Sequence, residues 1–417
     1  MIPAPMISVD EAIRIIQEES ERLAPERVEL PLALNRFLAE ETFADTDLPP
    51  FDRAQMDGYA LRAADTRSVP ARLRVVGEAA AGRGWHQVLQ EGEAVRIMTG
   101  APVPEGADSV QQVELTREAA GEAAGEAAGE GGEGTVLIDA ATRPGQFIVA
   151  RASEIKAGEK MLGAGERINA AMMAALASFG YARVRVGARP RVAILATGTE
   201  LVPVGERPGP DQIRDSNSFS LAAYAELAGA LVERLPLAGD DLRLLQEEIQ
   251  AAAVRSDTLV LSGGVSMGVY DFTKTALRNL GAEIFFERVS LRPGKPTVFA
   301  RLGRTLVFGL PGNPVSVSVT FNLFARTALC AMQGASETAL REEWAVLAGR
   351  LKGTSERTSY LPVTLRTNEE GQLLAQPLKW GGSSDFVAFA RATALAIVPA
   401  NVPALEAGTR IRFVRLP

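Results

Sequence analysis

Histidine and cysteine are almost absent from this chain of 417 residues, which contains one of each, His86 and Cys330. A single cysteine excludes an intramolecular disulfide and a metal site built from several cysteines. A histidine-based triad or zinc site would depend entirely on His86, which lies beside Trp85 in a glycine-rich stretch and which we interpret as a surface or packing residue. The chemistry is therefore expected from other side chains and from the backbone.

Long apolar runs, a basic surplus and the common nucleotide motifs are also missing. No run of 18 apolar residues occurs, and residues 1–19 lack a basic segment followed by an apolar core, so we expect a cytoplasmic protein without a membrane partner. The net charge of −7 argues against a nucleic-acid partner. Neither G-x-x-x-x-G-K-[ST] nor G-x-G-x-x-G after a strand is present, which disfavours a P-loop and a Rossmann dinucleotide site.

The length predicts about three domains, at roughly 150 residues per domain. Residues 48–139 contain short Val, Ile and Leu runs broken by Gly and Pro, which predicts a small β domain. Within it, residues 117–134 repeat a GEAA unit without large apolar side chains, which is typical of a solvated, mobile loop. Residues 335–417 again alternate strands with turns and predict a small β barrel or sandwich.

Residues 181–334, between these β segments, alternate strand and helix patterns. Strands are expected at 191–198, 230–239 and 257–264, and helices at 218–229, 241–255 and 272–281. Such alternation predicts a mostly parallel sheet with helices on both faces. A further helix is expected near the N-terminus, with Ser8 as its N-cap and Glu11 three residues later. The fold class is therefore multidomain α/β plus β.

Small and polar residues follow the strands of this sheet, at the edge where open α/β sheets bind ligands. Glycine lets backbone N–H groups approach an oxyanion closely, and the helix N-termini behind the loops add partial positive charge. One such turn alone is explained by tight loop geometry, but several at one edge favour an anion site. The candidate loop residues are Gly198, Thr199, Ser262, Gly263, Gly264 and Gly312.

Two turns rich in proline support the same expectation. In LPGNP, residues 310–314, Asn313 can cap the following helix and Pro314 can occupy its first position. In SLRPGKPT, Arg292 and Lys295 flank Pro293-Gly294 and offer two cations to a phosphate or a molybdate-like dianion. Without the neighbouring loops, these two cations would be interpreted as part of a solvated surface turn.

Two aspartates stand out at the same edge. Asp240 follows the second strand, and Asp271 immediately precedes the helix expected at 272–281. An aspartate at a helix start is usually an N-cap, which alone would explain Asp271. Carboxylate oxygens are also the ligands that Mg²⁺ takes when it bridges phosphates, so capping and metal roles both stay open.

Several longer stretches, taken together, are specific to one family. LPPFDRAQMDGYAL, IMTGAPVPEGADSV, ILATGTEL, SGGVSMGVYDFTK, RPGKP and GLPGNPVS follow one another over nearly the whole chain. In this combination they resemble the MoeA-type molybdopterin molybdenumtransferases. The resemblance implies a homodimer whose subunits have four domains. These are an elongated helical domain (1–47 with 140–180), a β domain (48–139), a molybdopterin-binding α/β domain (181–334) and a C-terminal β barrel (335–417).

The resemblance also implies a reaction, the insertion of molybdate into the dithiolene of adenylylated molybdopterin with release of AMP and participation of Mg²⁺. Its catalytic residues would be Asp57, Thr99, Glu200, Asp240, Asp271 and Lys295, with Asp240 and Asp271 as the Mg²⁺ ligands. Its cofactor-binding residues would be Gly198, Thr199, Ser262, Gly263, Gly264, Arg292, Pro311, Gly312, Asn313, Pro314, Arg357 and Ser383. Asp57 and Thr99 would reach the α/β domain of the other subunit, which places the site at the subunit cleft.

The expected mechanism follows from these roles. The α/β loops would hold the pterin phosphate and the adenylate, Mg²⁺ would polarise the phosphoanhydride, and Lys295 and Arg292 would attract molybdate. Arg292 stands where relatives often have lysine, so the charge is kept while its geometry changes. Candidate protein partners are a molybdopterin adenylyltransferase and apo-molybdoenzymes.

The chain departs from the family pattern in two places. DRAQ, residues 52–55, replaces the more usual DNSA, which leaves the substrate contacts near Arg53 open, and the GEAA insertion lengthens the β domain. Two other functions stay open at this point. The α/β domain could adenylylate molybdopterin with ATP, or the whole chain could be a non-catalytic scaffold that clusters receptors.

Overall fold

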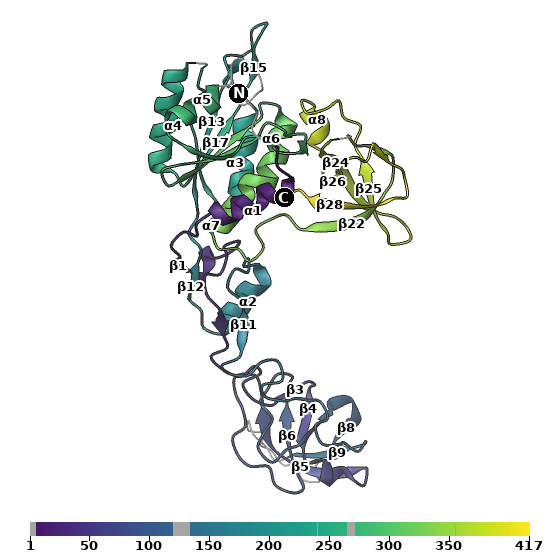
Figure 1. Ribbon diagram of the computed structural model, residues 1–417. Helices are drawn as coiled ribbons and strands as arrows, with labels where there is room; N and C mark the ends of the chain where they lie inside the picture. The colour runs from purple at the N-terminus through teal and green to yellow at the C-terminus, as the bar shows by residue number, and fades with distance from the viewer. Residues whose placement is uncertain (1–5, 120–133, 240, 265–271, 355) are drawn as a thin grey trace. The chain divides into compact units, whose positions relative to one another are not determined.

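The computed structural model describes residues 6–119, 134–239, 241–264, 272–354 and 356–417. The chain forms two compact units (Figure 1). The larger unit comprises Met1–Glu40, Gly163–Ala174 and Tyr181–Pro417, and the smaller comprises Glu41–Leu162 and Ala175–Gly180. The expected division into four domains stays a prediction.

A six-stranded sheet in the order β16-β13-β17-β21-β20-β18 forms the centre of the larger unit (Figure 1). Its strands are β13 (Arg191–Ala196), β16 (Leu231–Arg234), β17 (Thr258–Ser262), β18 (Glu283–Phe286), β20 (Val298–Leu302) and β21 (Thr305–Leu310). The first four strands in the order pair in parallel, whereas β21 with β20 and β20 with β18 pair antiparallel. This confirms the mostly parallel sheet.

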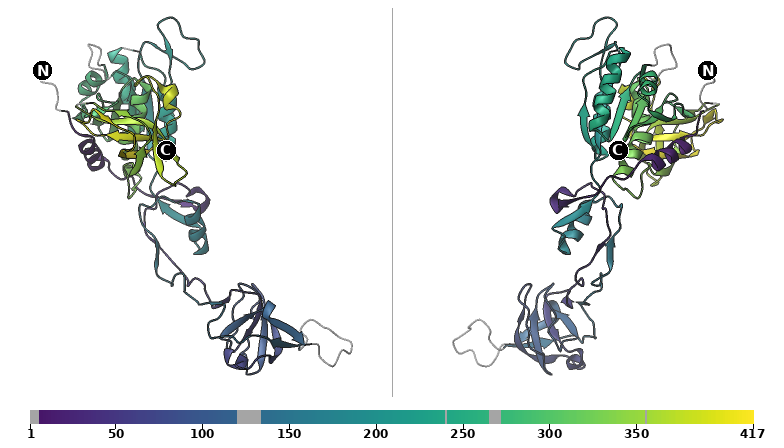
Figure 2. Two further views of the ribbon diagram at one scale, coloured as in Figure 1. Left: turned by 90° about the vertical axis from the view of Figure 1, so that its right-hand side faces the viewer. Right: turned by 60° about the vertical axis from the view of Figure 1, so that its left-hand side comes forward.

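Helices cover both faces of this sheet, as Figure 2 shows from two further sides. They are α1 (Val9–Glu19), α3 (Asn217–Leu227), α4 (Leu242–Arg255), α5 (Phe272–Asn279), α6 (Pro314–Thr320), the π-helical η4 (Phe321–Ala325) and α7 (Arg326–Met332). Residues of α4 and α5 share one apolar core, and residues of α1, α3, α6, η4 and α7 share the core on the opposite face. The N-cap of α1 is Ser8, as predicted, because its side chain accepts a hydrogen bond from the Glu11 N–H at 3.1 Å.

The run from α6 to α7 is a single buried helix. Among the described residues, Pro314–Met332 is the one helix whose length and composition would allow it to cross a membrane, and 89% of its most apolar window is buried inside the protein. Its polar side chains bond back to carbonyls four residues earlier, as Asn322 does to Ser318 at 2.9 Å and Thr327 to Leu323 at 2.8 Å. The helix therefore belongs to the core beneath the sheet.

A closed β barrel follows the sheet in the larger unit. Its strands are β22 (Glu342–Leu347), β24 (Thr358–Thr367), β25 (Leu373–Pro377), β26 (Ala394–Val398) and β28 (Arg410–Arg415). They pair in the order β24-β25-β22-β28-β26, and β26 returns to β24, which closes the ring. β19 (Leu291–Arg292), from the α/β segment, adds to β24 in parallel and links the barrel to the sheet domain. The C-terminal barrel is confirmed.

The smaller unit is built on a six-stranded sheet in the order β7-β4-β6-β5-β9-β8 (Figure 1). Its strands are β4 (Gly58–Leu61), β5 (Ala71–Ala79), β6 (Glu93–Ile97), β7 (Ser109–Gln112), β8 (Thr116–Ala119) and β9 (Gly134–Ile138). Since β8 and β9 pair antiparallel, the low-complexity segment is part of a strand at Arg117, where a mobile loop was expected to begin. Its centre, residues 120–133, lies outside the described residues.

Short elements complete the description. They are β1 (Glu26–Glu29), η1 (Leu30–Leu32), β2 (Thr42–Phe43), β3 (Arg53–Ala54), η2 (Ala63–Thr66), η3 (Val113–Leu115), β10 (Ile148–Val149), β11 (Lys160–Leu162), α2 (Ala170–Ser178), β12 (Arg183–Val186), β14 (Leu201–Val202), β15 (Ile213–Arg214), β23 (Leu351–Lys352), α8 (Phe386–Phe389) and β27 (Ala404–Leu405). The short strands pair as β1 with β12, β2 with β11, β3 with β10, β14 with β15 and β23 with β27. The segments 1–47 and 140–180, expected to form an elongated helical domain, contain α1, α2 and one complete strand pair, β2 with β11, whereas β1 and β10 pair with strands outside these segments.

Candidate functional site

The carboxyl edge of the central sheet has the topology of a ligand-binding crevice. The chain leaves β13 toward α3 on one face, whereas it leaves the neighbouring β17 toward α5 on the other. Loops that diverge in this way open a crevice between the two strand ends. Because β20 is antiparallel to β21 and Val298 pairs with Gly309, the RPGKP turn before β20 lies at this same edge. The topology therefore gathers the described parts of the loops that were predicted for the α/β segment.

Backbone hydrogen bonds hold three of these loops in register. The Thr197 N–H donates to the Ser262 carbonyl at 2.9 Å, and the Gly263 N–H donates to the Leu310 carbonyl at 3.1 Å. Gly263 has a φ of +98°, and a Cβ there would lie 2.4 Å from the Thr197 carbonyl oxygen, so the close approach requires glycine. The ends of β13, β17 and β21 consequently form one rigid rim.

These bonds also divide the backbone donors of the rim into two groups. The N–H groups of Thr197, Gly198 and Gly263 are used inside the protein. Those of Gly264, Gly312 and Asn313 have no acceptor in the part of the chain that the structure describes. The second group can therefore donate to an anion, whereas Gly198 and Gly263 contribute loop geometry.

The LPGNP turn is joined to the barrel. Pro314 is the first residue of α6, as predicted, and Asn313 stands at the N-cap, but its side chain makes no capping hydrogen bond. Instead the Asn313 amide donates to the Ser383 hydroxyl at 3.0 Å, while the Ser383 carbonyl accepts the Val315 N–H at 3.0 Å. The expected side-chain cap is thus wrong, since Ser383 takes over the N–H that a cap would have bound. Pro311 is buried beneath the turn.

The RPGKP turn carries a cluster of cations at the seam between sheet and barrel. The Arg292 guanidinium donates to the Gly353 carbonyl at 3.4 Å, and Arg357 donates to the Leu291 carbonyl at 3.3 Å. Arg292, Lys295 and Arg357 are all half-buried. Partly desolvated cations bind a dianion more strongly than exposed ones do, because water screens them less.

Gly294 packs this turn against α6. A Cβ at Gly294 would lie 2.4 Å from Thr320 Cγ2, near the end of the helix. Pro314 begins the same helix, and six residues of helix rise by about 9 Å. The two turns therefore flank α6 from opposite ends, with the cations of one separated from the N–H donors of the other.

The acidic candidates of the larger unit are only partly described. Glu200 is exposed and folds over Gly198, since a Cβ at Gly198 would lie 2.5 Å from Glu200 Oε2, and Thr199 beside it is also exposed. Asp240 and Asp271 lie outside the described residues. The N-cap of α4 is Asp241, which accepts the Leu244 N–H at 3.0 Å.

Neither a metal cluster nor a reactive thiol is found among the described residues. These residues contain no group of three or more His, Cys, Asp or Glu side chains arranged to hold a metal. Burial raises the pKa of the Cys330 thiol, which keeps it protonated and unreactive. His86 is exposed, in agreement with its interpretation as a surface residue.

The smaller unit contains the remaining predicted pair, Asp57 and Thr99. The Thr99 N–H and the Thr99 hydroxyl both donate to Asp57 Oδ1, each at 2.7 Å. These two bonds, the backbone one first, lower the pKa of Asp57 below its ordinary value. The carboxylate is therefore ionised throughout the neutral range and held in one orientation.

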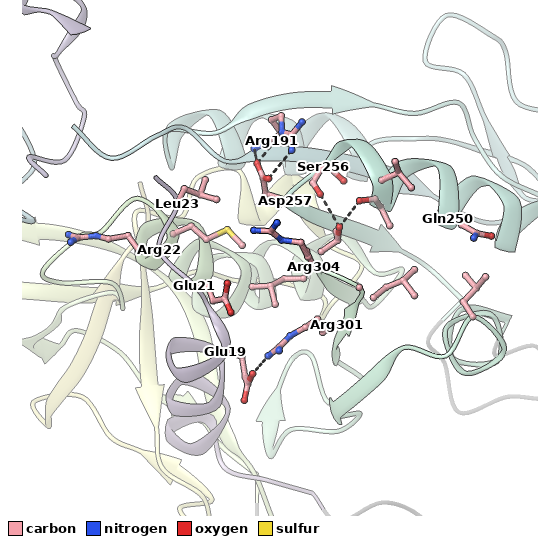
Figure 3. Close-up of a pocket in the computed structure, with 18 of the residues that line it drawn as sticks. Glu19, Glu21, Arg22, Leu23, Arg191, Gln250, Ser256, Asp257, Arg301 and Arg304 are labelled. Carbon is pink, nitrogen blue, oxygen red and sulfur yellow. Dashed lines mark hydrogen bonds and ion pairs between the residues drawn. The ribbon is translucent and has the colours of Figure 1, made fainter. Parts of the chain in front are cut away.

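A cavity of about 890 Å³ lies at the opposite, amino-terminal edge of the sheet (Figure 3). Two of its four arginines are paired with carboxylates, Arg301 with Glu19 and Arg191 with Asp257 at 3.0 Å. Paired cations leave little charge for a ligand, and ligands of open α/β sheets bind at the other edge. We therefore assign the chemistry to the carboxyl edge.

Asn217, the first residue of α3, was not singled out from the sequence. Its amide donates to Ser262 Oγ at 2.9 Å and to the Gly312 carbonyl at 2.7 Å, so it bridges the β17 and β21 loops. An asparagine at the start of a helix is normally interpreted as a cap, which hides any other role. Its position opposite two glycine-rich loops is visible only in the folded chain.

Models of known protein families match almost the whole chain. Residues 7–180 match the MoeA N-terminal region (domain I and II), residues 193–331 a probable molybdopterin binding domain, and residues 345–416 the MoeA C-terminal region (domain IV). The first match includes the whole smaller unit, the second most of the central sheet and the third most of the barrel.

Full-length relatives point the same way. A molybdopterin molybdenumtransferase of Bacillus subtilis is 35% identical, over 98% of this chain and 94% of its own. Another, from Nostoc sp., is 33% identical over 99% of this chain and 94% of its own. The solved structure of a molybdopterin biosynthesis MoeA protein from Pyrococcus horikoshii is 30% identical with a TM-score of 0.79, covering 99% of both chains.

Proposed function

The chain belongs to the MoeA family of molybdopterin molybdenumtransferases, and from this premise we propose that it inserts molybdate into the dithiolene of adenylyl-molybdopterin with release of AMP. The observation that carries the proposal is the carboxyl edge of the sheet, where anion donors and cations flank the same helix. The substrates, a phosphoanhydride and an oxyanion, are both anions and need such a site. The enzyme is thus a transferase whose catalysis relies on electrostatics and positioning.

The rim at the ends of β13, β17 and β21 holds the phosphates in this proposal. Its donors are the Gly264, Gly312 and Asn313 N–H groups, which have no acceptor within the described ranges, together with the N-terminus of α6. Thr199 and Ser262 add hydroxyl groups to the same rim. When water cleaves the phosphoanhydride and AMP departs, fixed dipoles of this kind stabilise the charge that develops on the phosphate leaving group.

The cations at the RPGKP turn attract molybdate. Lys295, Arg292 and Arg357 are half-buried. Ser383, which accepts a hydrogen bond from Asn313 at 3.0 Å, lies instead beside the phosphate rim. At the cations two molybdenum–sulfur bonds form while one molybdenum–oxygen bond breaks, and the oxide leaves as water with the protons of the two dithiolene thiols. The spacing of about 9 Å along α6 separates this step from the phosphate rim.

Asp57 and Thr99 complete the site from the second subunit of a homodimer. The family resemblance supports this role, and so does the ionised, oriented Asp57 carboxylate. Exposed apolar side chains on the larger unit, Leu32 at 67%, Leu34 at 49% and Leu227 at 52%, offer a surface for subunit association. Adenylyltransferases and apo-molybdoenzymes are proposed as transient partners, in the cytoplasm.

Mg²⁺ is part of the proposal through Asp240 and Asp271, both outside the described residues. A bound Mg²⁺ would supply Lewis-acid polarisation of the phosphoanhydride. The described residues contain no alternative cluster of carboxylates for it. The roles of the rim and of the cations given above do not depend on this ion.

The alternatives are not favoured. An adenylyltransferase needs only the α/β domain, whereas residues 7–180 and 345–416 of this chain also match the MoeA N-terminal and C-terminal regions. A purely scaffolding chain does not need the ionised Asp57 or the cation cluster.

Anaerobic molybdenum transfer tests the proposal. Purified protein is mixed with adenylyl-molybdopterin, Mg²⁺ and micromolar molybdate, and AMP release and reconstitution of an apo-molybdoenzyme are followed together. We expect both signals to rise and both to fall with Asp57→Ala. AMP release without reconstitution contradicts the transferase function, and adenylylation of molybdopterin by ATP without molybdate would support the adenylyltransferase instead.

A further inference from the structure

We propose that Asn217 is a positioning residue that fixes the Ser262 hydroxyl as a hydrogen-bond donor to a phosphate oxygen of the substrate. This inference rests on the proposed function and adds a residue to its phosphate rim. Asn217 donates to Ser262 Oγ at 2.9 Å and to the Gly312 carbonyl at 2.7 Å. The two acceptors belong to the loops after β17 and β21, so one amide ties together both sides of the rim.

The Gly312 carbonyl determines which way the Asn217 amide points. A carbonyl can only accept, so the NH₂ group of Asn217 must face it, because the flipped amide would place two acceptor oxygens 2.7 Å apart. The same NH₂ group carries the second hydrogen bond, to Ser262 Oγ. Ser262 is therefore the acceptor in its bond with Asn217, and its own hydroxyl hydrogen has to point elsewhere.

The Ser262 hydroxyl has no acceptor of its own among the described residues. Ser262 is 2% exposed, and its hydroxyl oxygen accepts the hydrogen bond from Asn217. A buried hydroxyl that cannot donate costs free energy, so this donor calls for a ligand acceptor. The Gly264 and Gly312 N–H groups on the same loops also have no acceptor in the described ranges. Three donors on neighbouring loops, with the acceptor side of Ser262 occupied, suit a phosphate group.

Asn217 is not needed to cap α3. The first turn of α3 is held by Asp215, which is 6% exposed and accepts both the Ser218 N–H at 3.0 Å and the Ser218 hydroxyl. Asn217 Oδ1 is buried and has no partner among the described residues. Only the donor end of the amide is used, and an unsatisfied acceptor is a cost that a purely structural residue would avoid. The residue therefore acts through its NH₂ group, and both of its contacts lie on the rim.

The competing explanation is that Asn217 has a purely structural role and only holds the Gly312 loop in place. The two explanations differ in whether Asn217 acts through Ser262. A double-mutant cycle with Asn217→Ala and Ser262→Ala separates them, because residues that act through one another have non-additive effects. The readout is the Kd of the full-length protein for molybdopterin under anaerobic conditions, with AMP as a second ligand. Ser216→Ala, which removes an exposed hydroxyl that makes no capping hydrogen bond at the N-cap of α3, is the matched control.

We expect each single variant to weaken phosphate binding about tenfold or more, the usual loss for a hydrogen bond to a charged group. The double variant should be weaker than Ser262→Ala by less than about twofold. Effects that multiply to about a hundredfold, or an Asn217→Ala variant that binds like the wild type, overturn the proposal. If affinity is lost for molybdopterin alone, Ser262 binds the pterin-side phosphate. If affinity is lost for AMP alone, Ser262 binds the phosphate of the adenylate.

Kinetic measurements and a second variant distinguish the proposed role of Asn217 from a simple folding defect. In Asn217→Ala the KM for adenylyl-molybdopterin should rise while the KM for molybdate stays unchanged, which a general loosening of the loops would not produce. Asn217→Asp keeps the shape of the side chain but presents an acceptor to Ser262, so the Ser262 hydroxyl hydrogen turns away from the ligand. This variant should bind molybdopterin at least as weakly as Asn217→Ala does. It replaces Asn217→Ala in the cycle should that variant fail to fold.

The cycle also distinguishes this inference from the proposed function. A wild-type protein that binds molybdopterin but transfers no molybdenum contradicts the function, while the binding cycle still decides the role of Asn217. A wild-type protein that binds neither molybdopterin nor AMP overturns both.

Discussion

Thr99 directs two hydrogen-bond donors at a single oxygen of Asp57, its backbone N–H and its hydroxyl, each at 2.7 Å from Oδ1. Both bonds favour the carboxylate over the protonated acid, which is why the pKa of Asp57 lies below its ordinary value. The contribution of these bonds to stability is complete above the pKa of Asp57 in the unfolded chain. It is lost only as the pH falls through the lower pKa of the folded state.

Removing the hydroxyl should therefore raise the pKa of Asp57 without abolishing its orientation. In Thr99→Val the backbone donor remains, so the pKa should move toward its ordinary value but stay below it, and molybdenum transfer at neutral pH should fall. The carboxyl ¹³C shift of Asp57 followed by NMR between pH 2 and 7 gives the pKa directly. Thr99→Ser keeps both donors and serves as the control, and an unchanged pKa in Thr99→Val would show that the hydroxyl bond does not form.

Gly263 is the position at which a single added methyl group should distort the rim. A Cβ there would lie 2.4 Å from the Thr197 carbonyl oxygen, and the φ of +98° disfavours any other residue. We expect Gly263→Ala to destabilise the protein by about 1–3 kcal/mol and to weaken molybdopterin binding. Urea denaturation measures the first effect. Gly205→Ala has no atom within 4 Å of its Cβ and should be close to neutral, so equal losses in both variants would contradict the steric argument.

The alternating pattern of strands and helices was sufficient to predict the sheet, because hydrophobic periodicity is local. Residues 191–198, 230–239 and 257–264 contain β13, β16 and β17, and Ser8 caps α1 as the capping pattern predicted. Side-chain partners far apart in sequence were not predictable in this way. Asn313 was expected to cap α6, but Ser383, 70 residues further along the chain, supplies the carbonyl that binds the Val315 N–H.

Asn217 and the GDD motif show the same limit. Asn217 lies 45 residues from Ser262 and 95 from Gly312, so nothing in its local sequence indicates the bridge that it forms. Of the two neighbouring aspartates at 240 and 241, the pattern could not say which one caps the helix. The structure assigns the cap to Asp241 through its bond with the Leu244 N–H.

Substitutions of the two aspartates of the GDD motif should consequently have different effects, one on stability and the other on activity. Asp241→Ala removes an N-cap and should cost about 1 kcal/mol of stability while molybdenum transfer persists. Asp240→Asn should leave the melting temperature nearly unchanged and abolish the response of the rate to Mg²⁺. Thermal unfolding and a Mg²⁺ titration of AMP release measure the two effects. The opposite pattern would exchange the roles of the two residues.

Substitution of Arg357 should weaken the binding of molybdate more than the binding of the pterin substrate. It is half-buried, and its bond to the Leu291 carbonyl at 3.3 Å places it beside the RPGKP turn. Loss of a charge-assisted hydrogen bond in Arg357→Gln should raise the KM for molybdate about tenfold or more, with a smaller effect on adenylyl-molybdopterin. Arg366→Gln, on the exposed side of β24, is the control. A rise confined to the KM for adenylyl-molybdopterin would move Arg357 to the phosphate rim.

The proposed homodimer makes a prediction about mixed subunits. If the Asp57–Thr99 pair of one subunit completes the site of the other, Asp57→Asn and Lys295→Ala disable different halves of the same site. Each variant alone should be inactive. After the two are denatured and refolded together in equal amounts, half of the dimers are mixed, and each mixed dimer holds one site with neither substitution. Activity should return to about a quarter of the wild-type value. Refolding each variant alone is the control, and a mixture that stays inactive would place Asp57 and Lys295 in the site of the same subunit.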